Sequence, residues 1–350
     1  MVDASNLFAR NFLDIKYDNL PKKVIDETKK QVLDFIGVAL GGYGQAGAKE
    51  IRELAVEWGG AQQSTIIGSG ARVPAPNAAQ ANATMVHSLD FDDVHEAAIM
   101  HPGVVTISTA LAMAEYRGGL SGRDFIQAIA VGGDMISRMG LATRPGDNVH
   151  KYGWHLTTLN GFMTSAAVAA KILGLNEDQM ISAIGIGYHQ SSGNGQAVKD
   201  GVLTKRLGPG FAVRGGIQAA MLAQKGVTGA RNSMEGVQGF YYVYHGNCYS
   251  RDILVGDLGR RLLGLHPVLF DREEALVPFL VVAIALGFIH VVLGLMLGMA
   301  AAWRHSRRHA AAKGATAAAI VLTMIVLLGF VGIMPKAAVL PGLILLVLCL

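Results

Sequence analysis

Residues 21–42 read PKKVIDETKKQVLDFIGVALGG, and this stretch indicates the fold class. Mostly apolar side chains recur in it at intervals of three and four residues: Ile25, Thr28, Val32, Phe35, Ile36 and Ala39. That spacing places them on one face of an amphipathic helix. We expect the helix to begin after Pro21 and to stop at Gly41 and Gly42, because glycine favours helix ends.

Helix-start signals recur further along the chain. Ser121 and Asp124 have the form of a capping box just before an apolar run, in which each side chain bonds the other residue's backbone N–H. Asn176 and Gln179 repeat the pattern before another apolar run. Both signals predict helices.

Other segments support the same fold class. Residues 161–175 are rich in alanine and predict a helix suited to close packing against its neighbours. Only residues 64–68, STIIG, are β-like, as a short strand or hairpin arm. We therefore expect residues 1–259 to form one all-α globular domain.

Beyond that point the chain becomes strongly apolar. The mean hydropathy of the whole chain is +0.36, yet the long apolar runs all lie near the C-terminus, at 276–303 and 315–334. Each is long enough to cross a bilayer as a helix, whereas a third run, 339–350, is a partial span. The sequence thus predicts two to three transmembrane helices in residues 276–350, after a junction at 260–275.

Charge divides at the same boundary. Residues 260–350 hold eight of the 30 basic and three of the 26 acidic side chains. The residues before them therefore hold 22 basic and 23 acidic side chains. The basic excess belongs to the membrane region, where it marks helix flanks, so we expect no nucleic-acid partner. Cys248 and Cys349 are far apart and predict neither a disulfide framework nor a metal site. The N-terminus resembles no secretory signal, so a cytoplasmic domain is expected, membrane-associated through its C-terminal helices.

One short region concentrates chemical groups. Residues 89–95 read LDFDDVH and are followed by HPG at 101–103. Crowded carboxylates raise one another's pKa, and a nearby histidine can share the proton. This suits acid–base chemistry on a small polar substrate. The alternative is structural: Asp92 and Asp93 cap a helix and His95 is solvated.

Three further clusters could join this region. His155 follows YGW just ahead of a helix, where free N–H groups can hold an anion, or it merely packs there. Residues 204–210, TKRLGPG, predict a turn with Lys205 and Arg206 available to a carboxylate or simply solvated. Arg214 precedes two glycines that we expect to open a helix at 217–224, and its guanidinium could pair with a carboxylate.

Taken in order, these motifs resemble the MmgE/PrpD family over residues 5–259. The family includes 2-methylcitrate dehydratase, cis-aconitate decarboxylase and an iminodisuccinate epimerase. The resemblance implies an all-helical core domain, a homodimer, and cofactor-independent lyase or isomerase chemistry, without a metal, on a di- or tricarboxylate. Dehydration, decarboxylation and epimerisation all remain open.

The resemblance also implies a set of site residues. Asp90, His101, His155 and Lys205 would face the substrate. His101 or His155 would transfer the proton, Asp90 would orient a histidine or act as the base, and Lys205 would hold a substrate carboxylate. The substrate-binding set comprises Asp93, Arg206 and Arg214.

The family's helical domain is followed by an α+β lid with a Lys-Pro-Tyr-Pro-like segment, and no such segment occurs here. We therefore expect weak polycarboxylate binding and slow or absent turnover. The apolar region instead resembles the membrane part of V-type ATPase subunit I, around LGFIHVVLGLMLG at 286–298. The alternative function is thus a membrane subunit fragment of a proton-translocating ATPase. For that function His290 is the ionisable residue within a span that would serve the proton path. Alternatively, it forms a hydrogen bond to a neighbouring helix. A chimera joined near residue 260 would explain both halves.

Overall fold

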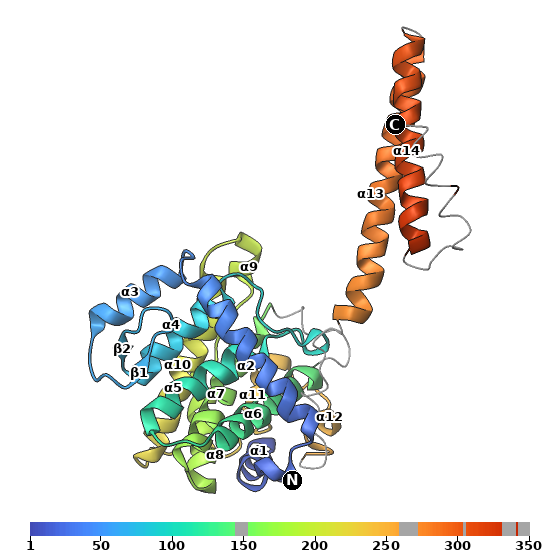
Figure 1. Cartoon of the computed structure of the whole chain (residues 1–350). Helices are drawn as coiled ribbons and strands as arrows, with labels where there is room; N and C mark the ends of the chain where they lie inside the picture. Colours follow the sequence, from blue (N-terminus) through green and yellow to red (C-terminus); the bar gives the residue numbers. More distant parts are fainter. Residues whose placement is uncertain (144–152, 259–271, 304–305, 331–340, 342–350) are drawn as a thin grey trace. The chain divides into compact units, whose positions relative to one another are not determined.

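The computed structural model describes residues 1–143, 153–258, 272–303, 306–330 and 341. The chain divides into two compact units, 1–269 and 270–350, and each is described by itself (Figure 1). The first contains α1 (Ala4–Asp14), η1 (Tyr17–Asn19), α2 (Lys22–Gly42), α3 (Ala48–Trp58), β1 (Ser64–Thr65), β2 (Arg72–Val73), α4 (Ala75–His87), η2 (Glu96–Ala98), α5 (Pro102–Arg117), α6 (Gly122–Ala142), α7 (Leu156–Leu173), α8 (Glu177–Gln190), α9 (Gln196–Asp200), α10 (Thr204–Gln224), α11 (Phe240–His245) and α12 (Arg251–Val255). The second contains α13 (Arg272–Trp303) and α14 (Arg307–Phe330). The all-α expectation is confirmed.

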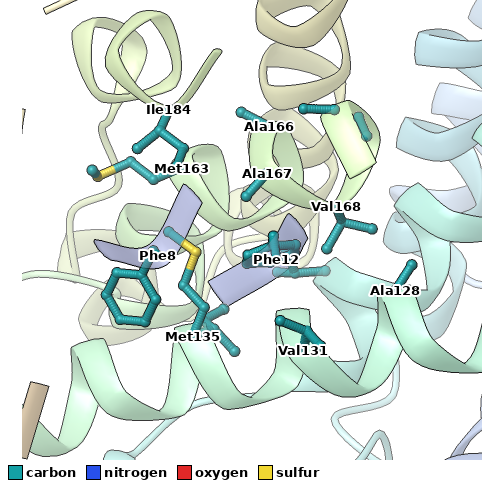
Figure 2. Packing of buried hydrophobic residues seen from close by; sticks show 14 of the residues in the cluster. Phe8, Phe12, Ala128, Val131, Met135, Met163, Ala166, Ala167, Val168 and Ile184 are labelled. Atoms are coloured by element: carbon teal, nitrogen blue, oxygen red, sulfur yellow. The ribbon is translucent and has the colours of Figure 1, made fainter. Parts of the chain in front are cut away.

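Helix α7 forms the centre of the first unit. Every residue from 156 to 170 is buried, and α7 packs against α5, α6, α8 and α10. Figure 2 shows the core at this centre, where Phe8 and Phe12 of α1 meet side chains of α6, α7 and α8. Burial of this apolar surface is the main stabilising contribution to the fold.

Small residues let the helices around α7 approach closely. A methyl group on Gly216 of α10 would lie 2.5 Å from Cβ of Ser165 on α7, and one on Gly161 would lie 2.9 Å from Cβ of Ala212. Such distances leave no room for a side chain. The expected small-residue helix is therefore present, although it begins at Leu156 rather than at residue 161.

The predicted helix starts are confirmed. The hydroxyl of Ser121 accepts a hydrogen bond from the Asp124 N–H, and Asn176 and Gln179 form a complete capping box. The first predicted helix is α2, which ends at Gly42. The β-like segment is β1, and it pairs antiparallel with β2, a strand that the sequence pattern did not indicate.

The turn predicted at 204–210 was wrong, and so was the helix start at 217. Both segments lie inside the continuous helix α10, with Pro209 and Arg214 in its interior. Proline's fixed φ is compatible with a helix, although it removes one backbone hydrogen bond. Gly208 and Gly210 serve packing instead, since a methyl group on Gly210 would lie 2.6 Å from Oγ1 of Thr84.

In the second unit, α13 and α14 pack against each other as a helical hairpin (Figure 1). Among the described residues one segment, Leu286–Trp303 of α13, is long and apolar enough to cross a membrane by length and composition. The second predicted span overlaps α14, and its last residues, 331–334, lie outside the described chain. The third, 339–350, also lies outside it except for residue 341.

Candidate active site

The loop between α4 and α5 carries the acidic motif. Two of its non-glycine residues, Asp90 (φ +58°) and Ile99 (φ +54°), adopt left-handed backbone conformations, which are uncommon for side-chain-bearing residues and costly for a β-branched one. A short antiparallel bridge between His95 and Met100 closes the loop. The strained backbone brings the carboxylates back over the ends of the two helices.

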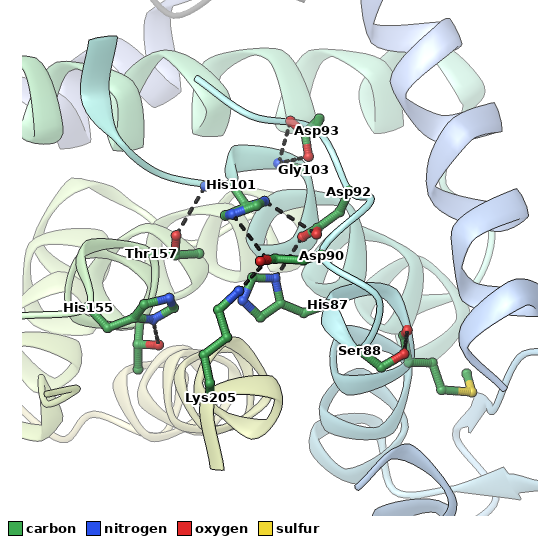
Figure 3. Close-up of polar contacts among 12 residues, drawn as sticks. His87, Ser88, Asp90, Asp92, Asp93, His101, Gly103, His155, Thr157 and Lys205 are labelled. Atoms are coloured by element: carbon green, nitrogen blue, oxygen red, sulfur yellow. Dashed lines mark hydrogen bonds and ion pairs between the residues drawn. The ribbon is translucent and has the colours of Figure 1, made fainter. Parts of the chain in front are cut away.

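Asp92 lies between two histidines beneath this loop (Figure 3). Its Oδ2 lies 2.9 Å from Nδ1 of His87, the last residue of α4. Its Oδ1 lies 3.3 Å from Nδ1 of His101, which precedes α5. The side chains of Asp92 and His87 are almost completely buried, and that of His101 is 15% exposed. A buried carboxylate therefore hydrogen-bonds the imidazole of His87 at the end of α4 and makes a close ion-pair contact with the imidazole of His101 just before α5.

Asp90 lies nearer the surface and contacts Lys205 of α10 through an ion pair. The same carboxylate oxygen is 3.7 Å from Nε2 of His101. The Asp90 side chain is 60% exposed, whereas that of Lys205 is 20% exposed. The loop, α5 and α10 thus contribute one charged group each to a single cluster.

His155 approaches the cluster from the start of α7. Its ring lies 5.7 Å from the ring of His87, and its Nδ1 is 2.7 Å from the hydroxyl of Thr158. Beside it is a cavity of about 200 Å³ whose lining includes His155, Thr158, Asn194, Lys205 and Phe211. A neutral imidazole, an ammonium group and an apolar wall therefore surround one small space.

The two outer histidines have opposite protonation preferences. Burial opposes the charge on His101, yet Asp92, Asp93 and Asp90 outweigh it and raise its pKa. Burial, together with the charges of His87 and Lys205, lowers the pKa of His155 to about 3. The raised pKa favours the protonated, donating form of His101, whereas His155 is neutral near pH 7. Environments that push two pKa values apart define an acid and a base.

Asp92 and Asp93 also have pKa values that are shifted in opposite directions. Burial disfavours the charge on Asp92, but its contacts with His101 and His87 hold its pKa far below the usual range. Burial and the nearby charge of Asp92 raise the pKa of Asp93 to about 7. Both Asp93 oxygens accept from the Gly103 N–H at the start of α5, 3.0 Å away. Asp93 therefore caps a helix, and its carboxylate lies at the backbone of α5 rather than at the cavity.

The two predicted arginines point elsewhere. Arg206 donates to the carbonyl oxygen of Ala46. The guanidinium of Arg214 lies over the ring of Trp58 and contacts Gln80 of α4. His95 is buried rather than solvated, and its ring accepts from a backbone N–H as the N-cap of η2. The structure thus brings together Asp90, His101, His155 and Lys205, but not Arg206 or Arg214.

The sequence interpretation missed two members of the cluster. His87 was not singled out, although it stands three residues before Asp90 in the same motif. Asp92 was counted among the crowded carboxylates or as a helix cap and was not placed in the predicted site, whereas it contacts two histidine rings. The signal for His87 was its position close before the acidic motif, whereas the sequence held no signal for the burial of Asp92.

Four residues of the cluster have the composition of a metal site. One donor atom from each of His87, Asp90, Asp92 and His101 lies within 4.8 Å of the others, and imidazole with carboxylate suits divalent transition metals. However, the ammonium group of Lys205 already contacts Asp90, and both oxygens of Asp92 face imidazoles. We therefore treat these residues as ion-pair and proton-transfer groups, not as metal ligands.

Comparison with known proteins places this site in a family. The model of the MmgE/PrpD N-terminal domain matches residues 7–250. The chain belongs to the MmgE/PrpD family. The match includes every residue of the cluster and ends at residue 250, ahead of α13.

The curated relatives of this chain include cis-aconitate decarboxylases and a protein named for its likeness to them. A cis-aconitate decarboxylase-like protein of Aspergillus oryzae is 31% identical over 62% of this chain and 46% of its own length. Cis-aconitate decarboxylase of Aspergillus terreus is 28% identical over 62% of this chain and 45% of its own length. Cis-aconitate decarboxylase of Homo sapiens is 30% identical over 68% of this chain and 49% of its own length. The chain spans about half the length of the curated relatives it matches.

Proposed function

We propose that this protein binds a di- or tricarboxylate at the cavity beside His155 and Lys205 and acts on it as a lyase or isomerase. One observation carries the proposal: two imidazoles of opposite protonation preference lie near one ammonium group, since Lys205 lines the cavity together with His155 and pairs with Asp90, whose carboxylate is 3.7 Å from His101. A cation holds a carboxylate, while an acid and a base beside it can move a proton at an adjacent carbon. The names of the curated relatives agree with such a substrate.

The groups fit each of the three reactions of this class. In dehydration His155 would take a C–H proton, and the leaving hydroxide would receive a proton from His101 to depart as water. In decarboxylation the C–C bond to a carboxylate would break and neutral CO₂ would leave. The electron pair of that bond would stay on the substrate carbon, which would then take the proton from His101. In epimerisation His155 would remove a C–H proton, and His101 would return one to the opposite face.

Turnover is tested with the full-length chain. Purified protein is incubated with cis-aconitate or 2-methylcitrate, and substrate and product are followed by proton NMR. We expect slow product formation from at least one of them, reduced at least a hundredfold in His101→Asn, because removal of a general acid costs about 10²–10⁴-fold in rate. Absence of product from both substrates, or product formation unaffected by His101→Asn, would reject the lyase assignment.

Assembly is a further part of the proposal. Leu33 and Leu40 of α2 are 73% and 53% exposed, with Ile36 between them on the same face. We propose that a second copy of the chain covers this stripe, in line with the homodimer that the family resemblance implies. Sedimentation analysis should show a dimer for the wild type and a monomer for Leu33→Glu.

A second candidate function concerns the helical hairpin. Apolar side chains of α13, among them Leu286, Ile289 and Leu297, are more than half exposed. We propose that α13 enters a membrane and tethers a cytoplasmic enzyme domain. The proton-translocating alternative requires in addition that the chain co-purify with a rotary ATPase in mild detergent, and failure to do so would leave the tether alone.

A further inference from the structure

The surroundings of Asp92 separate it from the other carboxylates of the cluster. Its side chain is 2% exposed, and each oxygen faces one imidazole: Oδ2 faces His87 at 2.9 Å and Oδ1 faces His101 at 3.3 Å. A charge buried to this extent is tolerated only with such partners. By contrast, Asp90 is 60% exposed and contacts Lys205, and it lies 3.7 Å from the ring of His101.

We infer that Asp92, held from behind by His87, is the positioning residue that fixes the imidazole of His101 for the proposed reaction. This inference rests on the proposed function and gives Asp92 the role that the sequence had suggested for Asp90. A carboxylate at Nδ1 fixes the tautomer and orientation of an imidazole and leaves Nε2 available for proton transfer. Here Nε2 of His101 faces the side of Asp90 and Lys205 (Figure 3).

His87 secures the carboxylate itself. Asp92 is ionised, so Nδ1 of His87 must carry the hydrogen that lies between them. Burial lowers the pKa of His87, although Asp92 opposes this effect, and the neutral ring therefore donates from Nδ1 alone. His87 ends α4, so its ring position follows from the packing of that helix. The backbone of His101 is anchored as well, because its N–H donates to the hydroxyl of Thr157 on α7.

The charged and titratable groups near His101 come from several elements of the fold. Its own loop contributes Asp90, Asp92 and Asp93, α4 contributes His87, and the starts of α7 and α10 contribute His155 and Lys205. Asp92 is buried and lies 3.3 Å from a ring nitrogen of His101, whereas Asp90 is 60% exposed and lies 3.7 Å away. Its effect on the ionisation of His101 should therefore exceed that of Asp90.

The experiment measures the ionisation of His101 without turnover. The full-length chain is labelled with ¹³C at histidine Cε1 in detergent micelles, and the His101 signal is identified by its loss in His101→Asn. We expect Asp92→Asn to lower the titration midpoint of His101 by at least one pH unit and the matched variant Asp90→Asn to lower it by less than half as much. Equal shifts, or a larger shift in Asp90→Asn, would overturn the inference.

A second pair of variants tests the role of His87 and does not require Asp92→Asn to fold. The amide of a glutamine can donate to Asp92 in place of the ring, whereas alanine cannot. Above its midpoint, neutral His101 should keep its hydrogen on Nδ1 in the wild type and in His87→Gln, and should shift toward the Nε2-protonated tautomer in His87→Ala. Nitrogen-15 chemical shifts report this. The same tautomer in all three proteins would contradict the inference, whether or not the chain turns over a polycarboxylate.

Discussion

The protonation state of Asp93, which caps α5, affects the stability of the whole first unit. Its pKa is about 7 in the folded chain, raised by burial and by Asp92, against an ordinary value of 3.8. A raised carboxyl pKa contributes stability that is fully present below pH 3.8 and is lost as the pH rises through 7. The wild type should therefore lose stability across this window relative to Asp93→Asn, whose amide cannot ionise.

The expected size is on the order of a few kcal/mol between pH 4 and pH 8, since each unit of pKa shift corresponds to about 1.4 kcal/mol. Thermal melting of both proteins across this pH range measures it. The melting temperature of Asp93→Asn should match or trail that of the wild type at pH 4 and exceed it at pH 8. A difference in melting temperature that does not change with pH would show that Asp93 titrates normally.

At the scale of elements, the fold depends on close contact between α7 and α10. A methyl group on Gly216 would meet Cβ of Ser165 at 2.5 Å and the backbone nitrogen of Ala166 at 2.7 Å. Because backbone cannot yield cheaply, Gly216→Ala should destabilise the unit by about 1–3 kcal/mol. Gly133 of α6 is the matched control, since a methyl group there has no neighbour within 4 Å.

In the control, Gly133→Ala should stabilise the chain by about 0.5–1 kcal/mol, because alanine has less conformational freedom to lose in a helix. Chemical denaturation of both variants against the wild type measures the two effects. Equal effects of the two substitutions would mean that α7 and α10 are not packed as closely as described.

The same helices show what sequence reasoning can reach. The caps at Ser121 and Asn176 were predictable because their hydrogen bonds are local. The continuity of α10 was not, because Gly208, Pro209 and Gly210 are typical of turns, and only the fit of these residues against α4 and α7 makes a helix favourable there. Local propensity gave way to tertiary packing.

The candidate site, too, was predictable from the sequence only in part. Asp90, His101, His155 and Lys205 could be listed from motifs that the family shares, and the structure brings them together. The part played by Asp92 depends on which carboxylate is buried, and no spacing in the sequence reports burial within a loop. Arg214 looked equally suitable, but its contact with Trp58 joins residues 156 positions apart.

For the whole molecule, the described core of the first unit is self-contained. Its buried apolar residues lie between Ala4 and Val255. Residues 1–259 expressed alone should therefore melt cooperatively within a few degrees of the corresponding transition of the full chain. Differential scanning calorimetry measures this, and a non-cooperative melt of the fragment would show that the apolar region is needed for folding.

Vesicle flotation with the same two proteins tests the proposed tether. The full chain should float with neutral phosphatidylcholine vesicles, because α13 presents exposed apolar side chains such as Leu293 and Leu297. Residues 1–259 should remain at the bottom of the gradient. Recovery of both proteins in the same fraction would contradict a membrane role for the hairpin.

The central claim is that Lys205 holds a substrate carboxylate between His101 and His155. Isothermal titration calorimetry of the full-length chain with cis-aconitate tests it most directly. Removal of one charge-assisted contact costs about 1.5–3 kcal/mol, so Lys205→Ala should weaken binding at least tenfold. Lys225→Ala, at the exposed far end of the same helix, should bind as the wild type does. Equal affinity of Lys205→Ala and the wild type, or no heat from the wild type at millimolar ligand, would contradict the account.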